Sequence, residues 1–274
     1  RQGNARRRIY WTDRGGRACL KASMMDRQFP KTSEVLSALG ISELTTHGRN
    51  RRSLRLVLLV PVIILLTWKG LVDKMGGGFV LSSCITIGLI SIGLMGYSNT
   101  IARDRARGIF QRLRVSPVPA WAIMASRLIV QIGMILVMTV IIFIVGYFYD
   151  GIRLTIGGYL ICLVMTLAGG ALYLGLGQAI VGRIQNPETV SSTSRLVYFA
   201  FIMIGMLGQF GTLGKQVERL VNWSPYGVVQ KVLDAGLIPG SWDATATLAL
   251  LFTIVYTLIL AVLGIRWFKW DTKR

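Results

Sequence analysis

Long stretches without a charged residue constrain this chain more than any other feature of its sequence. Each of the longest contains no Asp, Glu, Lys or Arg, and each can cross a hydrocarbon core of about 30 Å, which takes roughly 20 helical residues. They are Met75–Ala102, Leu128–Tyr149, Leu154–Gly182, Leu196–Gly214 and Ala244–Ile265. A further candidate, Leu54–Val72, is tighter, because Arg55 and Lys69 lie within it and must reach toward the two membrane surfaces. The pattern predicts an all-α polytopic membrane protein with six transmembrane helices.

The distribution of charge sets the expected orientation. The chain has 274 residues, 31 of them basic and 12 acidic, and its formal net charge of +19 first suggests a nucleic-acid partner. If the amino terminus is cytoplasmic, however, most of the basic residues fall in inner segments, which is the positive-inside bias of membrane proteins. We therefore expect an N-in, C-in topology, a basic surface facing anionic membrane lipids, and no nucleic-acid partner.

Two parts of the chain differ in composition. Residues 1–50 are polar and basic, and we expect a cytoplasmic N-terminal segment that is partly disordered or forms a surface helix. Residues 51–274 contain all six candidate spans and are predicted to form one membrane domain.

The candidate spans carry no apparatus for catalysis or for ion coupling. One histidine and three cysteines form neither a metal-ligand spacing nor a nucleophile–base arrangement, so we expect no metal site and no enzyme activity. All 12 acidic residues lie outside the six candidate spans or at their ends, whereas ion-driven carriers use acidic groups inside theirs. An ion-coupled secondary carrier remains an alternative, but uphill transport here is expected to take its work from a partner.

The segment between the fifth and sixth candidate spans is too apolar for a free outer loop. A bare loop dipping into the membrane would leave its backbone polar groups unpaired, whereas two short helices satisfy them. We expect outer re-entrant helices broken at Ser224–Pro225, with Trp223, Pro225 and Tyr226 forming an outer gate.

Small residues recur every four positions in the fourth candidate span. Ala171, Gly175 and Ala179 would lie on one helical face and form a ridge. Such a ridge lets another helix approach closely, so we expect helix packing there.

A charged segment joins the second and third candidate spans. Residues 101–127 are predicted to continue the second span as a charged helix that exposes Ile109, Phe110 and Leu113 and stops at Pro117. Such an element can press into a groove on a soluble protein while it stays joined to a span. The alternative is a basic turn that binds lipid headgroups.

The same segment carries a family resemblance. Asp104–Pro117, D-R-A-R-G-I-F-Q-R-L-R-V-S-P, resembles the E-R-E-R-G-T-x-E-R-L-x-V-[ST]-P signature of type-2 ABC transporter permeases. Asp104 stands for the first acid, and the other matching residues are Arg105, Arg107, Gly108, Arg112, Leu113, Val115, Ser116 and Pro117. Ala106, Ile109 and Gln111 depart from the signature and leave the segment more basic. Asn222–Gln230 and the R-W-F-K-W ending are also similar to the family, so the resemblance covers roughly Arg51 to the end.

The resemblance implies the permease subunit of an ATP-driven exporter. Such a subunit pairs with a second permease chain, as a homo- or heterodimer, and with two separate ABC ATPase subunits. ATP and Mg²⁺ would lie on those subunits, so no cofactor is expected on this chain. The signature segment would be the cytoplasmic coupling helix, seated in a groove on the ATPase. The implied coupling residues are Asp104, Arg105, Arg107, Gly108, Ile109, Phe110, Arg112, Leu113, Arg114 and Pro117.

The expected cargo is a hydrophobic or amphiphilic small molecule, moved outward across a bacterial plasma (inner) membrane. A compact permease without a large external domain resembles the drug- and antibiotic-efflux branch, but lipid-linked polysaccharide exporters share the same core and remain an alternative. A membrane scaffold or immunity factor without transport is a third class. The residues expected along the transport path are Tyr97, Asn99, Tyr198, Phe199, Met203, Met206 and Gln209. The alternative for these side chains is helix packing or lipid contact.

Overall fold

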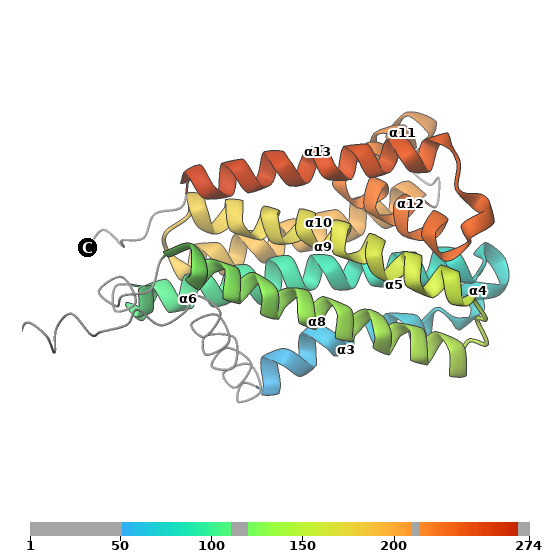
Figure 1. Ribbon diagram of the computed structural model, residues 1–274, viewed down its shortest axis with the longest axis horizontal. Coiled ribbons are helices and arrows are strands. Elements are labelled where there is room, and N and C mark those ends of the chain that lie inside the picture. The colour runs from blue at the N-terminus through green and yellow to red at the C-terminus, as the bar shows by residue number, and fades with distance from the viewer. Residues whose placement is uncertain (1–50, 111–119, 210–213, 268–274) are drawn as a thin grey trace, which may run out of the picture.

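The computed structural model describes residues 51–110, 120–209 and 214–267. All the regular elements in these ranges are helices, which confirms the all-α prediction. They are α3 (Arg51–Thr67), α4 (Lys69–Met75), α5 (Gly77–Ile90), η1 (Ser91–Ser98), α6 (Asn99–Ala106), α8 (Ala120–Phe148), α9 (Ile156–Arg183), α10 (Pro187–Gln209), α11 (Lys215–Trp223), α12 (Pro225–Leu237), η2 (Pro239–Ser241) and α13 (Ala244–Trp267). The long helices run side by side along one axis (Figure 1).

Five helices in the described ranges are long and apolar enough to cross a membrane. They cover Gly77–Ala106, Ile123–Phe148, Ile156–Arg183, Pro187–Gly208 and Ala244–Trp267. The expected first span corresponds to α3, which has 17 residues and an apolar part of only Leu58–Thr67. At about 1.5 Å per residue α3 rises about 25 Å, which is short of a full hydrocarbon core.

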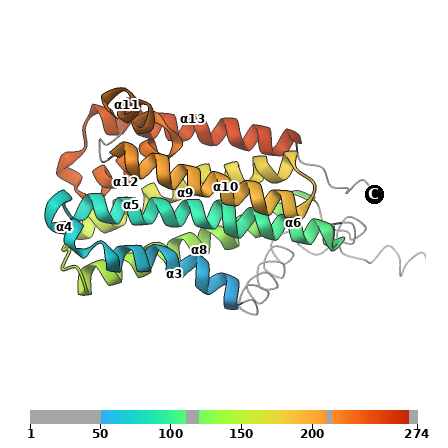
Figure 2. The ribbon, with the colours of Figure 1, turned by 180° about the vertical axis from the view of Figure 1, so that it is seen from behind.

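The helix bundle has two distinct ends. Figures 1 and 2 place α6 and the carboxyl end of α13 together at one end, which we call the elbow end. They place α4, α11 and α12 at the opposite end, which we call the re-entrant end. The two regions that the sequence singled out for function therefore lie at opposite ends of the molecule.

Gly77–Ala106, which corresponds to the second candidate span of the sequence, is the centre of the bundle. It consists of α5, the π-helical segment η1 and α6 in one continuous run, and 89% of its most apolar window is buried, against 17% for α13. Its residues Val80–Leu94 are buried on every side, because α3, α8, α9, α10 and α12 all pack around it. Motion of this span therefore requires its neighbours to move as well.

A direct backbone-to-backbone contact joins η1 to α9. A Cβ added at Gly93 would lie 2.5 Å from the backbone oxygen of Tyr173, and one added at Gly177 would overlap the backbone oxygen of Gly93. Glycine is required at both positions because the two backbones touch directly.

Several predicted span boundaries were wrong in the same way. The second span continues to Ala106 instead of ending near Ala102, α8 begins at Ala120 instead of Leu128, and α10 begins at Pro187 instead of Leu196. Each predicted boundary was set at the nearest charge. A spanning helix can include a charged residue when that residue lies in a terminal turn or has a partner of opposite charge. Asp104 lies in the last turn of α6, and its partner Arg127 lies in α8.

Candidate coupling elbow and transport path

The elbow consists of Asp104–Phe110 together with Arg127. The α6 helix ends at Ala106, and the amides of Arg107 and Gly108 close the last turn by donating to the Arg103 and Arg105 oxygens, both at 3.0 Å. Gly108 then takes a φ of 69°, in the left-handed region that glycine adopts without strain. Helix resumes at Ile109 and Phe110. The charged helix predicted to run on from the second span is therefore broken at Gly108.

An ion pair joins the second span to the third across the elbow. Nη1 of Arg127 donates to Oδ2 of Asp104 at 2.6 Å, and the two side chains are only 5% and 15% exposed. The Arg127 guanidinium also lies over the ring of Phe110, 4.8 Å from its centroid. Because the pair is mostly desolvated, removal of either partner would leave a buried charge without compensation.

Arg105 joins the same elbow to the fourth span. Its Nη1 donates to the backbone oxygen of Ile184, at 3.2 Å. Ile184 is the residue that follows the last turn of α9, where backbone oxygens lack intrahelical donors and carry partial negative charge. A guanidinium is therefore well placed to close that helix end.

Burial divides the predicted coupling residues into two groups. Arg105 and Phe110 are each 2% exposed, so the expectation that Phe110 presents an exposed docking contact was wrong: its ring is covered by Arg127. Arg107 is exposed, and Gly108 and Ile109 are half-buried. The remaining predicted coupling residues, Arg112, Leu113, Arg114 and Pro117, lie outside the described residues.

The two predicted path residues Tyr97 and Asn99 differ in burial and in hydrogen-bond partner. Tyr97 is 1% exposed, and its hydroxyl donates to Oε1 of Gln178 on α9 at 2.7 Å. Asn99 is half-buried, and its Nδ2 donates to the Met95 backbone oxygen at 2.9 Å. Tyr97 thus cross-links two spans, and its expected contact with cargo stays a prediction.

The predicted path residues of α10 lie on two different faces. Tyr198 is buried against the bundle, whereas Phe199 and Met203 are 56% and 51% exposed. Met206 follows at helical spacing and is half-buried. We call Phe199, Met203 and Met206 the α10 stripe. Nothing is described of the Gln209 side chain.

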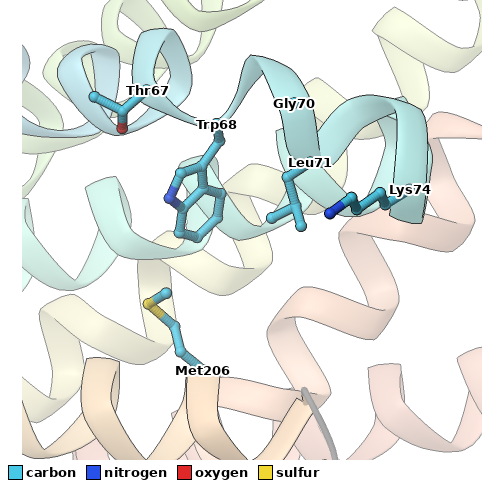
Figure 3. Close-up of a pocket in the computed structure, with 6 residues that line it drawn as sticks. All are labelled: Thr67, Trp68, Gly70, Leu71, Lys74 and Met206. Carbon is cyan, nitrogen blue, oxygen red and sulfur yellow. The ribbon is translucent and has the colours of Figure 1, made fainter.

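The α10 stripe leads to a recess at the re-entrant end. The recess has a volume of about 450 Å³ and lies between the α3–α4 bend and α10 (Figure 3). Its lining residues are Thr67, Trp68, Gly70, Leu71, Lys74 and Met206. Figure 3 shows the Trp68 indole and the Met206 thioether facing one another across it. Sequence reasoning named Met206 but missed the five residues opposite.

The predicted break at Ser224–Pro225 is confirmed. Ser224 begins α12, where its hydroxyl oxygen accepts from the Gly227 amide at 3.3 Å, and Pro225 occupies the first helical turn, where no amide donor is needed. The Tyr173 hydroxyl donates to the Pro225 oxygen at 3.1 Å, which fastens the break to α9. Hydrogen bonds within α12 and to α9 therefore satisfy backbone groups at the break itself.

The predicted gate residues pack against the spans in different ways. Tyr226 is fully buried in the core. Trp223 lies at the surface, where its ring contacts Phe252 of α13 at a centroid distance of 5.1 Å and its backbone oxygen accepts from the Tyr256 hydroxyl at 3.0 Å. Deeper in α12, Nε2 of Gln230 donates to the Ser83 hydroxyl on α5 at 3.1 Å. The helix pair thus contacts three spans, α5, α9 and α13.

The small-residue ridge on α9 makes contact with α13. A Cβ added at Gly175 would lie 3.3 Å from the Leu260 Cβ, so the two helices approach closely there. Ala179 is buried, whereas Ala171 is exposed. No group of three or more His, Cys, Asp or Glu side chains lies together in the described ranges.

Comparison with known proteins decides the family. The family model of the ABC-2 type transporter matches residues 35–233, which is more than half of the chain and includes the elbow, the α10 stripe and most of α12. The chain belongs to the ABC-2 type transporter family. No curated protein matches the sequence. The protein is therefore a multi-pass transport subunit of an ABC transporter, as the signature implied.

The contacts of this ABC-2 transporter subunit differ in how far the sequence could indicate them. Arg127 could have been noticed, because an arginine within a spanning helix such as α8 needs a partner. The roles of Gln178 and Ile184 gave none, because a polar side chain and a backbone oxygen acquire partners only when helices far apart in sequence come together.

Proposed function

We propose that this chain is the permease subunit of an ABC exporter that moves an amphiphilic small molecule outward across a bacterial plasma membrane, driven by ATP hydrolysed on separate ATPase subunits. In this proposal two permease chains form the transporter, and the elbow end faces the cytoplasm. The α3 helix, extended by α4, supplies the sixth crossing.

The observation that carries the proposal is the attachment of the elbow to three spans at once. The elbow continues α6 directly, holds α8 through Asp104 and Arg127, and holds the end of α9 through Arg105. A force applied to the turn at Arg107–Gly108 is therefore delivered to three spans together. This is the mechanical property required of a contact site for a motor subunit.

Charge supports the same assignment. Arg107 is exposed at the turn, while the other charged groups of the described elbow are used in internal contacts. An exposed arginine beside a half-buried apolar residue, Ile109, suits a soluble partner with a carboxylate next to an apolar groove.

Co-purification tests the proposal. A tagged chain isolated from its own cells is expected to bring down a subunit that contains a P-loop and hydrolyses ATP. Arg107→Glu is expected to lose this subunit, because reversed charge repels a carboxylate partner. Arg153→Glu is the matched control, since Arg153 is exposed on the turn between α8 and α9 at the opposite end. Vesicles that contain only this chain and still accumulate solute against a gradient would overturn the proposal.

A further inference from the structure

The recess at the re-entrant end combines an apolar wall with a cation. Trp68, Leu71 and Met206 supply aromatic, aliphatic and thioether surface, and Lys74 is the only charged residue among the described residues that line it. The ammonium of Lys74 has no ion-pair or aromatic partner among the described residues, whereas Lys69, on the same short helix, lies over the Tyr149 ring at 4.6 Å. Lys74 is therefore a cation that has apolar neighbours but no carboxylate of its own.

The remaining lining residues leave room for a ligand. A Cβ added at Gly70 would meet no heavy atom within 4 Å, so the recess is open at that residue. The Thr67 hydroxyl donates to the Ile64 backbone oxygen at 2.8 Å and is left as an acceptor only. The volume of about 450 Å³ falls within the range of small-molecule sites.

The α10 stripe extends the recess toward the middle of the membrane. Phe199 and Met203 are exposed on the same face as Met206, at the i, i+4 and i+7 spacing of one helical side. An extended apolar body can therefore lie along α10 while its polar head stays in the recess. Methionine and aromatic side chains adapt to such bodies of varied shape.

We propose that this recess binds an anionic amphiphile, a molecule with one acidic headgroup and a hydrophobic body. The headgroup would pair with the Lys74 ammonium, and the body would pack on Trp68 and Met206. The binding site stands on its own observations; that its ligand is the exported cargo rests on the function proposed above.

Quenching of tryptophan fluorescence tests the site. The probes are 11-bromoundecanoate and the neutral 11-bromoundecanol, whose bromine quenches a nearby indole, added to the purified full chain in a zwitterionic bilayer disc. We expect the anion to quench at lower concentration than the alcohol. Trp68→Phe is expected to remove the saturable part of the quenching, which assigns it to the recess.

Two matched pairs of variants separate charge from fold. Lys74→Gln is expected to weaken binding of the anion about tenfold with no change for the alcohol, because a charged hydrogen bond is lost. Lys74→Arg should retain binding, and Lys215→Gln, which removes an exposed lysine outside the recess, should match the wild type. Gly70→Phe is expected to block both probes by filling the recess. Gly133→Phe, at another glycine with open space around it, should block neither.

The outcomes discriminate clearly. Equal binding of the two probes to the wild type, unchanged anion binding in Lys74→Gln, or full saturable quenching in Trp68→Phe would each overturn the site. Competition by phosphatidylglycerol in the disc would identify membrane lipid as the source of the headgroup, and no competition would identify a free amphiphile. No ATPase takes part in this assay, so failure of the site and failure of the proposed transport function are separate results.

Discussion

The elbow and the α11–α12 helix pair are attached to the spans by different kinds of contact. The elbow uses charges: an arginine–aspartate pair, a second arginine on a helix end and an exposed third arginine at the turn. The α11–α12 pair contacts the spans through uncharged groups: the Tyr173 hydroxyl donates to the Pro225 oxygen, and Gln230 donates to the Ser83 hydroxyl. A serine cap within the pair begins α12. Charged side chains are costly within the hydrocarbon region unless they are paired, whereas uncharged hydrogen bonds can satisfy polar groups there. Charged groups attach α6 to α8 and α9, whereas uncharged groups attach α12 to α5 and α9. In the function proposed above, the charged end transmits force and the uncharged end closes the bundle.

The largest effect is expected from breaking the elbow ion pair on one side. Arg127→Met leaves the mostly buried Asp104 carboxylate without its partner and should cost about 3–5 kcal/mol of unfolding free energy. The measurement is thermal unfolding of the purified chain in detergent. Asp104→Asn combined with Arg127→Met should recover most of the loss, because no charge is then left unpaired. A double variant as unstable as the single would show that the pair does not fasten the elbow.

A smaller loss is expected from steric change at the re-entrant end. The Gly227 Cα faces backbone, and an added Cβ would overlap the Val221 oxygen and lie 2.7 Å from the Asn222 Cα. Backbone cannot yield as a flexible side chain can, so Gly227→Ala should destabilise by about 1–3 kcal/mol. Gly157→Ala is the control, because a Cβ there meets nothing within 4 Å. Equal melting temperatures for the two variants would contradict the tight turn between α11 and α12.

The serine cap of α12 should contribute less than the steric fit. Ser224→Ala removes the acceptor for the Gly227 amide and is expected to cost about 1 kcal/mol. Ser241→Ala, whose exposed hydroxyl only bonds the nearby Ile238 oxygen, should stay within about 0.5 kcal/mol of the wild type. Equal melting temperatures for Ser224→Ala and Ser241→Ala would show that the serine cap does not stabilise α12.

The smallest effects are expected from two acidic residues in the connections at the re-entrant end, and their pH dependences should have opposite signs. Burial raises the pKa of Asp150, and Lys69 opposes the rise. The folded state therefore favours the protonated acid, and stability falls as the pH rises from the ordinary aspartate pKa through the raised one. Asp150→Asn should flatten this slope and stabilise the protein at neutral pH.

Asp243 should behave in the reverse sense. Hydrogen bonds from the Ala246 amide and the Thr245 hydroxyl hold its pKa below the ordinary value. Its contribution is therefore present above the ordinary aspartate pKa and is lost as the pH falls through the lowered one. Asp243→Asn should weaken the protein at neutral pH only slightly, because the group is exposed. Melting curves from pH 3 to pH 7 check both variants, and parallel slopes would contradict the assignment.

The sequence predicted most of the fold because lipid imposes simple requirements on it. Uncharged runs located the five long spans, and Ser224–Pro225 located the break between α11 and α12. It misplaced the starts of α8 and α10, because charges were interpreted as boundaries. Arg127 shows why this fails: a charge with a partner on a neighbouring span can lie inside a helix. The pairing itself depends on tertiary structure and leaves no mark on local sequence.

The site was predicted less completely than the fold. The signature located the elbow, but nothing local could show that Arg105 and Phe110 turn inward, because their partners come from α9 and α8. Tyr97 was predicted to contact cargo because its hydroxyl is polar, and in the structure this hydroxyl donates to Gln178. The recess could not be predicted from the sequence, because residues of α3, α4 and α10 come together to form it only in the folded structure.

The glycine contact between η1 and α9 has a consequence for how such a protein can work. The backbones of the two helices touch at Gly93 and Gly177, so no side chain lies between them that could change rotamer. Translation or rotation of one helix against the other would therefore cost energy. The contact holds η1 and α9 in one fixed register. We expect a push at one end to tilt the two helices together as a stiff lever, rather than bend either one.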